Sequence, residues 1–213
     1  MSGWLRERFG AGRRPAAATR WVVVDCETSG LDPGRDSLIS IAGVGVRDGR
    51  IAPGDSFCAT LRQERPSGRE NILIHGIGRE RQADGDAPAA AIEGFLGFAA
   101  DAPRVAFRAP FDKAVVARAA RAVGRREGGL WLDLAQLLPV QFPDRGRPEA
   151  TLDRWLATFG IAHPARHDAL GDAYATAQLF QAALREAGRQ GFRTVGAVLR
   201  AARSSRWAGR CAF

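Results

Sequence analysis

The stretch that most constrains the fold is residues 20–30, RWVVVDCETSG, in which an uninterrupted apolar run ends in two acidic residues. Trp21 and the three valines after it are aromatic or β-branched, which predicts a strand buried on both faces of a sheet. Side chains alternate between the faces of a strand, so Asp25 and Glu27 point to one side and Cys26 to the other. Two adjacent, half-buried carboxylates repel each other unless a cation lies between them, and Mg²⁺ or Mn²⁺ prefers carboxylate oxygen. The pattern indicates either a metal site at the end of a strand or two hydrated acids at a strand exit.

The chain has 213 residues, which is enough for one domain with a sizeable hydrophobic core and too few for two domains of ordinary size. Its net charge of +8 is uneven, because residues 1–20 carry +4 and residues 185–213 carry +6. Basic ends suit a polyanionic partner such as nucleic acid, although an arginine-rich composition with Lys113 as its single lysine can also reflect nucleotide bias in the genome. We expect three parts: a flexible basic arm over residues 1–19, a main domain over residues 20–187, and a basic extension over residues 188–213.

Cysteine usage and hydropathy point to a reducing, cytoplasmic setting. The three cysteines are odd in number and have no short metal-ligand spacing, so neither a disulfide framework nor a zinc site is expected. No apolar run approaches the length of a membrane span, so no membrane partner is expected. An amphipathic anchor or transit peptide within residues 1–19 is a minor alternative, because the apolar content of that segment is small.

Hydrophobic periodicity predicts an α/β fold. Strands are expected at residues 21–27, 38–46, within 56–61, 104–107 and 131–134, and helices at 87–100, 111–123, from Thr151, at about 170–187 and at 191–203. Asp48-Gly49 predicts a hairpin. Residues 62–81 are predicted to be a loop that packs against the rest of the domain at one point. Three strands in succession followed by alternating strands and helices predict a mixed sheet, antiparallel over its first three strands and then parallel, with helices on its faces. Ligands in such sheets bind at the carboxyl ends of strands, where Asp25 and Glu27 lie.

Two other segments can supply groups to the same place. Asp112 follows the strand at residues 104–107 and begins a helix, where an acid is also favoured by the helix dipole alone. His167 and Asp172 lie five residues apart, so both reach one site only if His167 precedes the helix; otherwise it is an exposed loop residue. Four carboxylates can hold two divalent ions, and a neutral histidine beside them can act as the general base. This combination indicates metal-assisted hydrolysis of a phosphodiester.

These segments together resemble the three motifs of the DnaQ-like 3′-to-5′ exonucleases, which have an Asp-Glu-Asp-Asp site and a final histidine. VVVDCETSGLDPGRDSLISIAGVGV resembles the first motif, APFDKAVV the second and HDALGDAYATAQLF the third, in the family's order over about residues 21–184. His75 to Ile77, HGI, is a further family feature. The resemblance implies a ribonuclease H-like fold and makes residues 20–187 the exonuclease domain.

The same resemblance assigns roles by position. It implies that Asp25, Glu27 and Asp172 hold one divalent cation, Mg²⁺ or Mn²⁺, that Asp25 bridges to a second, that Asp112 helps through water, and that His167 is the general base. Thr28 and Leu31 would contact the terminal nucleotide, and His75 is expected among the substrate-binding residues.

One departure from the family pattern concerns Phe107-Arg108, where many members carry His-Asn. The asparagine usually helps to orient the strand near the scissile phosphate. Arg108 could replace its neutral hydrogen bond with a charge-assisted contact to phosphate, so altered substrate handling is expected rather than loss of activity.

The leading hypothesis is an enzyme that releases 5′-mononucleotides from single-stranded or frayed 3′ ends, of DNA before RNA, as polymerase proofreading subunits do. A DNA polymerase subunit is then a candidate partner. The alternatives are an RNA-trimming exoribonuclease of the same family and a non-catalytic module that binds nucleic acid or tethers a polymerase. A metal-dependent phosphatase of small molecules would leave the basic ends unexplained.

Overall fold

A computed structural model describes residues 12–147, 149–163 and 167–208. Residues 1–11 of the predicted arm and 209–213 of the predicted extension lie outside the described residues. The strands are β1 (Trp21–Thr28), β2 (Leu38–Arg47), β3 (Arg50–Thr60), β4 (Arg104–Ala106) and β5 (Trp131–Asp133). The helices are α2 (Arg69–His75), α3 (Arg79–Ala83), α4 (Pro88–Ala99), α5 (Pro110–Ala122), α6 (Leu134–Gln141), α7 (Leu152–Thr158), α8 (Ala169–Arg189) and α9 (Val195–Ala208).

The described part of the chain forms one five-stranded sheet in the order β3-β2-β1-β4-β5. β1 pairs antiparallel with β2, and β2 with β3, whereas β1–β4 and β4–β5 are parallel. The mixed sheet with three antiparallel strands first is therefore confirmed. Asp48 and Gly49, with φ of 52° and 68°, make the tight turn between β2 and β3, and positive φ at both turn residues matches the twist of a hairpin.

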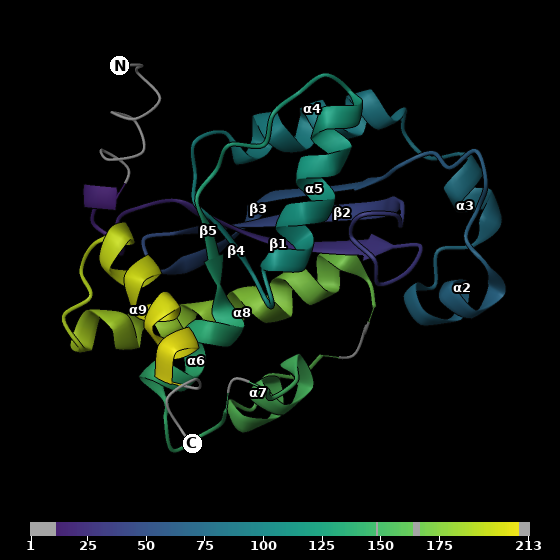
Figure 1. Ribbon diagram of the computed structural model, residues 1–213. Coiled ribbons are helices and arrows are strands. Elements are labelled where there is room, and N and C mark those ends of the chain that lie inside the picture. The colour runs from purple at the N-terminus through teal and green to yellow at the C-terminus, as the bar shows by residue number, and fades with distance from the viewer. Residues whose placement is uncertain (1–11, 148, 164–166, 209–213) are drawn as a thin grey trace.

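Helices cover both faces of the sheet (Figure 1). On one face Val22 and Val24 of β1 pack in a core with α4 and α5. On the other face Trp21 and Val23 pack in a second core with α8, and the ring of Phe180 on α8 lies 5.2 Å from that of Trp21. β1 is apolar on both sides because it is the central strand of this three-layer arrangement. The end of β1 is thereby fixed relative to the helices that carry the other candidate residues.

The prediction of a loop over residues 62–81 was wrong, because this segment contains α2 and the start of α3. Both helices are short, and neither N-cap glycine, Gly68 or Gly78, supplies a side-chain cap. Leu73 and Ile74 on α2 are 75% and 55% exposed, so the segment lacks the buried apolar stripe that identifies a helix in sequence. The buried amide of Gln82 holds the two helices together by bonding the Ser67 hydroxyl at 3.0 Å and the Ile77 carbonyl at 2.8 Å.

The start of the described chain packs against the segment that leads into α9. Ala16 is buried, and its backbone N–H donates to the carbonyl of Arg193 at 2.8 Å. Arg14 pairs with Asp101 at 2.7 Å, so this arginine of the basic ends already has an acidic partner. The final helix α9 buries Val195, Val198 and Leu199 in the same core as α6 and α8. No helix within the described ranges is long and apolar enough to cross a membrane.

Candidate active site

The end of β1 presents the first two acids beside an irregularity in the strand. Asp25 pairs with Ala42 on β2 and Glu27 with Ser40, and the register shifts between Glu27 and Thr28. Such bulges bend a strand and redirect its side chains. Asp25 and Glu27 face the α8 side of the sheet, because Ala42 belongs to the core on that side, whereas Cys26 packs in the other core.

Glu27, His167 and Asp172 meet at the carboxyl end of β1. One ligand atom from each, a carboxylate oxygen or a ring nitrogen, lies within 4.8 Å of the other two. Figure 1 shows the start of α8, together with α2 and α3, gathered at the end of the sheet where β1 ends. Residues from opposite ends of the chain thus combine two acids and an imidazole in one group.

The start of α8 explains how His167 and Asp172 reach the same place. Asp168 is the N-cap and accepts a hydrogen bond from the Gly171 N–H at 2.9 Å, so His167 precedes the helix, as the five-residue spacing required. His167 has a φ of 61°, in the left-handed region that is uncommon for residues other than glycine. Its backbone N–H donates to Oδ2 of Asp172 at 2.9 Å.

A second histidine also contacts Asp172. The Nε2 atom of His163 is hydrogen bonded to Oδ1 of Asp172, and the two side chains are only 7% and 8% exposed. The sequence signals a proline-containing loop here and gives no reason to bring His163 to the carboxylate.

Asp112 approaches the end of β1 from the other face of the sheet and, like Asp25, lies outside the cluster of Glu27, His167 and Asp172. It lies in the first turn of α5, is 6% exposed, and is hydrogen bonded to the thiol and backbone of Cys26. Burial raises the pKa of Asp112 to about 7, with a further contribution from the charge of Asp133, although the hydrogen bonds act against it. Burial also raises the pKa of the Cys26 thiol, and the charges of Asp112, Asp25 and Glu27 add to this effect. All three acids therefore lie close around Cys26.

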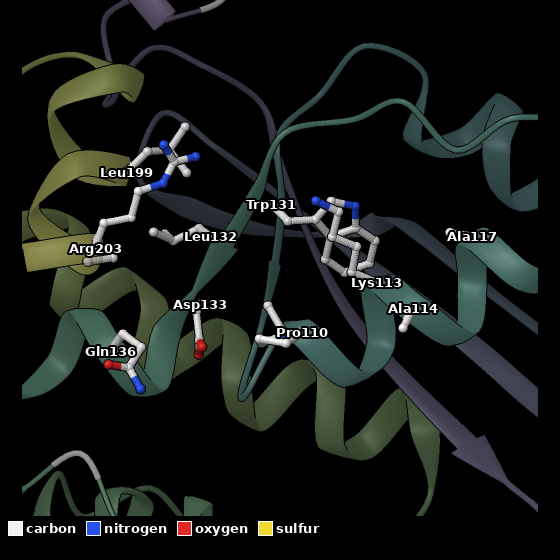
Figure 2. A pocket seen from close by; sticks show the side chains of 12 residues that line it. Pro110, Lys113, Ala114, Ala117, Trp131, Leu132, Asp133, Gln136, Leu199 and Arg203 are labelled. Carbon is white, nitrogen blue, oxygen red and sulfur yellow. The ribbon is translucent and has the colours of Figure 1, made fainter. Parts of the chain in front are cut away.

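A hollow of about 420 Å³ is lined by residues of α5, β5, α6 and α9. Figure 2 shows Leu199 and Arg203 of α9 on one side of it and Pro110 and Lys113 of α5 on the other, with Asp133 of β5 between them. Asp133 therefore lies beside the helix that carries Asp112. Its negative charge contributes to the raised pKa of the Asp112 carboxyl group.

The loop after β1 carries two predicted substrate-binding residues. The hydroxyl of Thr28 is buried and donates to the carbonyl of Gly30 at 2.6 Å, whereas Leu31 is 91% exposed. Arg118 of α5 ties this loop down, because its guanidinium donates to the carbonyls of Pro33, at 3.0 Å, and of Asp36. The loop thus presents an apolar side chain to solvent from a restrained backbone.

The other two predicted substrate-binding residues make intramolecular contacts. Nδ1 of His75 accepts from the Ile77 N–H at 2.9 Å, and Nε2 bonds Asn71 Oδ1 at 2.8 Å, so both ring nitrogens are engaged. Arg108 is exposed, has a φ of 63°, and reaches the carbonyl of Glu149 at 3.3 Å. His75 is 4% exposed and supports the loop after α2, and Arg108 points toward the segment before α7.

The donor set fits a hard divalent cation. The carboxylate oxygens of Glu27 and Asp172 lie within 4.8 Å of each other, and carboxylate oxygen is the ligand that Mg²⁺ and Mn²⁺ prefer. The raised pKa of Asp112 is the expected behaviour of a buried acid that lacks a compensating charge, and a nearby cation would supply that charge.

Comparison with known proteins gives a consistent family. The model of the exonuclease family matches residues 22–180. A DNA polymerase III subunit epsilon-like protein of Rhodobacter capsulatus is 36% identical over 189 residues, which are 87% of this chain and 26% of that protein. DNA polymerase III PolC-type of Thermotoga maritima is 31% identical over 165 residues, 75% of this chain and 11% of that protein. The chain therefore spans about a quarter or less of the length of these two relatives.

Solved structures share the fold at low sequence identity. E. coli exonuclease I in complex with a dT13 oligonucleotide gives a TM-score of 0.69 at 19% identity, over 81% of this chain and 42% of that one. Exonuclease X in complex with 5′ overhanging duplex DNA gives 0.65 at 23% identity, over 84% of this chain and 99% of that one. With three motifs in order, a family model that matches residues 22–180 and a relative that aligns over most of this chain, the chain belongs to the exonuclease family.

Proposed function

We propose that this protein is a metal-dependent 3′-to-5′ exonuclease that releases 5′-mononucleotides from the 3′ ends of DNA. The observation that carries the proposal is the meeting of Glu27, His167 and Asp172 within 4.8 Å at the end of β1, in a member of the exonuclease family. In this proposal Asp25, Glu27, Asp112 and Asp172 hold two divalent cations, Mg²⁺ or Mn²⁺. When bound, such cations stabilise the charge on the attacking and leaving oxygens of a phosphodiester.

The residues of the chain have separate tasks in this mechanism. His167 accepts the proton of the attacking water at a ring nitrogen, which requires its imidazole to be neutral. The exposed Leu31 side chain contacts the terminal nucleotide, and Thr28 shapes the turn that presents it. The hydrogen bond from Arg108 to the Glu149 carbonyl is long, at 3.3 Å. Arg108 therefore gives it up and contacts the phosphate backbone instead. His75 acts through the loop it supports.

The substrate proposal draws on the chemistry of the structural neighbours. Exonuclease I is bound to a single-stranded oligonucleotide and exonuclease X to a duplex with a 5′ overhang, which has a recessed 3′ end. We therefore propose single-stranded or frayed 3′ ends of DNA as the substrate. Because the relatives are named as subunits or forms of DNA polymerase III, we also propose a DNA polymerase subunit as partner.

The activity is tested with a single-stranded oligonucleotide labelled at its 5′ end, incubated with the full chain and Mn²⁺ or Mg²⁺. We expect a ladder of products shortened stepwise from the 3′ end, no ladder with EDTA, and loss of most activity in Asp25→Ala. The exposed acid Asp144, replaced by alanine, is the matched control and should retain activity. Equal degradation by Asp25→Ala and wild type would contradict the assignment.

Parallel substrates separate the related alternatives. A ribo-oligonucleotide of the same sequence distinguishes an RNA-trimming enzyme, which would degrade it faster than the DNA strand. A 3′-phosphorylated strand tests direction, because a blocked 3′ terminus should slow the release of the first nucleotide. Binding of the strand without any metal-dependent cleavage would instead indicate a non-catalytic module.

A further inference from the structure

Both carboxylate oxygens of Asp172 are hydrogen bonded to residues that precede α8. Its Oδ1 atom is bonded to Nε2 of His163, and its Oδ2 atom accepts from the backbone N–H of His167 at 2.9 Å. Donors on both oxygens prevent the carboxylate from rotating about the bond that joins it to Cβ. The orientation of this carboxylate is therefore set by the protein before any ligand arrives.

The hydrogen bond from His163 has a defined direction. A carboxylate that binds a cation is ionised and has no proton to donate, so in the proposed site Nε2 of His163 is the donor. The bond is also sheltered, because both side chains are more than nine-tenths buried. A buried bond to an ionised acceptor is stronger than a neutral one and is costly to break.

A hydrogen bond to a carboxylate oxygen does not by itself prevent that oxygen from binding a cation. Each carboxylate oxygen has two lone pairs, so Oδ1 can accept the His163 hydrogen and still coordinate an ion with its other lone pair. The ligand atoms of Glu27 and His167 lie within 4.8 Å of that of Asp172. Hydrogen bonds to ligating carboxylates fix their geometry, and removing such a partner typically lowers metal affinity about 10- to 100-fold.

We propose that His163 is a positioning residue that orients the carboxylate of Asp172 for a divalent cation. The inference rests on the proposed function, in which Asp172 is a metal ligand. It assigns His163 a task different from that of His167, which has its ring in the cluster and donates its backbone N–H to Asp172. The rival arrangement is a His163 that competes with the cation for Asp172.

The test measures Mn²⁺ binding to the full chain by calorimetry, without nucleic acid. We expect His163→Ala to bind Mn²⁺ about 10- to 100-fold more weakly than wild type. His163→Gln should recover part of the loss, because the side-chain amide N–H can reach the same oxygen. Thr151→Ala is the matched control: it removes the side-chain cap of α7, which precedes the same loop, and should leave Mn²⁺ affinity unchanged.

A second measurement on the wild type does not depend on the variants folding. The ring N–H signal of His163 in nitrogen-edited NMR should persist when Mg²⁺ is added, because the bond to Asp172 is retained. Disappearance of the ring proton on Mg²⁺ binding would show that the cation displaces His163 and would overturn the inference.

The calorimetric outcomes separate the two proposals. Wild-type binding with an unchanged or tighter affinity in His163→Ala overturns the positioning role and leaves the metal site intact. A loss in Thr151→Ala as large as that in His163→Ala also overturns it, because the effect would then follow from stability alone. A wild type that binds neither Mn²⁺ nor Mg²⁺ overturns the proposed function, and this inference with it.

Discussion

The buried carboxylate of Asp112 is hydrogen bonded to Cys26, which lies between Asp25 and Glu27 on β1. Cys26 faces away from its two acidic neighbours, so the contact joins α5 on one face of the sheet to acids that face α8 on the other. The site is therefore built around the end of the central strand, and its electrostatics depend on groups from both faces.

Asp112 should make the metal-free protein less stable as pH rises. Its folded pKa of about 7 lies above the 3.8 of an ordinary aspartate, so its stabilising contribution is complete below about pH 4 and is lost as pH rises through 7. In EDTA, we expect the wild type to lose about 1 kcal/mol or more relative to Asp112→Asn between pH 4.5 and 7.5. Thermal unfolding of both proteins at several pH values measures the difference. Parallel curves for the two proteins would contradict the burial effect.

Arg118 should control how the loop after β1 presents Leu31. Arg118→Ala removes the bonds to the carbonyls of Pro33 and Asp36, which frees the loop without touching the acids. We expect the KM for a single-stranded oligonucleotide to rise several-fold, with a smaller change in kcat, because ordering the loop then costs entropy on binding.

Arg121→Ala is the control for Arg118, because Arg121 lies on the exposed surface of the same helix. It removes the same charge from α5 but no bond to the loop. An equal rise in KM for both variants would attribute the effect to charge rather than to loop positioning.

His75 should contribute mainly to stability. Replacing it by alanine leaves the buried Ile77 N–H without its acceptor and removes the bond to Asn71 Oδ1, which should cost about 2 kcal/mol. Burial lowers the pKa of His75, and the charge of His167 adds to this, so its stabilising contribution is present above about pH 6.5 and is lost at lower pH. Denaturant unfolding at pH 7.5 and pH 5 measures both effects. Unchanged stability with impaired substrate binding would instead identify a direct contact.

The helix α9 should be necessary for the stability of the whole domain. Leu199 is 7% exposed and packs in the core shared with α6 and α8, so Leu199→Ala should cost about 2 kcal/mol or more. Arg200→Ala, at the exposed neighbouring position, should change stability by less than about 0.5 kcal/mol. Unfolding by urea compares them, and an unchanged midpoint in Leu199→Ala would show that α9 is dispensable.

The sequence by itself determined the central strand, the mixed sheet with antiparallel strands first and parallel strands after, and the residue types at the carboxyl end of the central strand. These follow from local rules: β-branched runs form buried strands, Asp48-Gly49 closes a hairpin, and Asp168 or Thr151 can cap a helix. Each depends on residues close together in the chain, so the pattern can be read without a fold.

Only the tertiary structure decided which side chains meet. His163 on Asp172, Cys26 on Asp112 and Arg118 on the loop after β1 join segments whose approach depends on how helices pack across the sheet. The sequence did not predict α2 and α3 for a related reason. Hydrogen bonds from the Gln82 side chain, rather than a buried apolar stripe, keep these helices in place. Contacts between distant segments depend on packing, and a local sequence pattern carries no record of them.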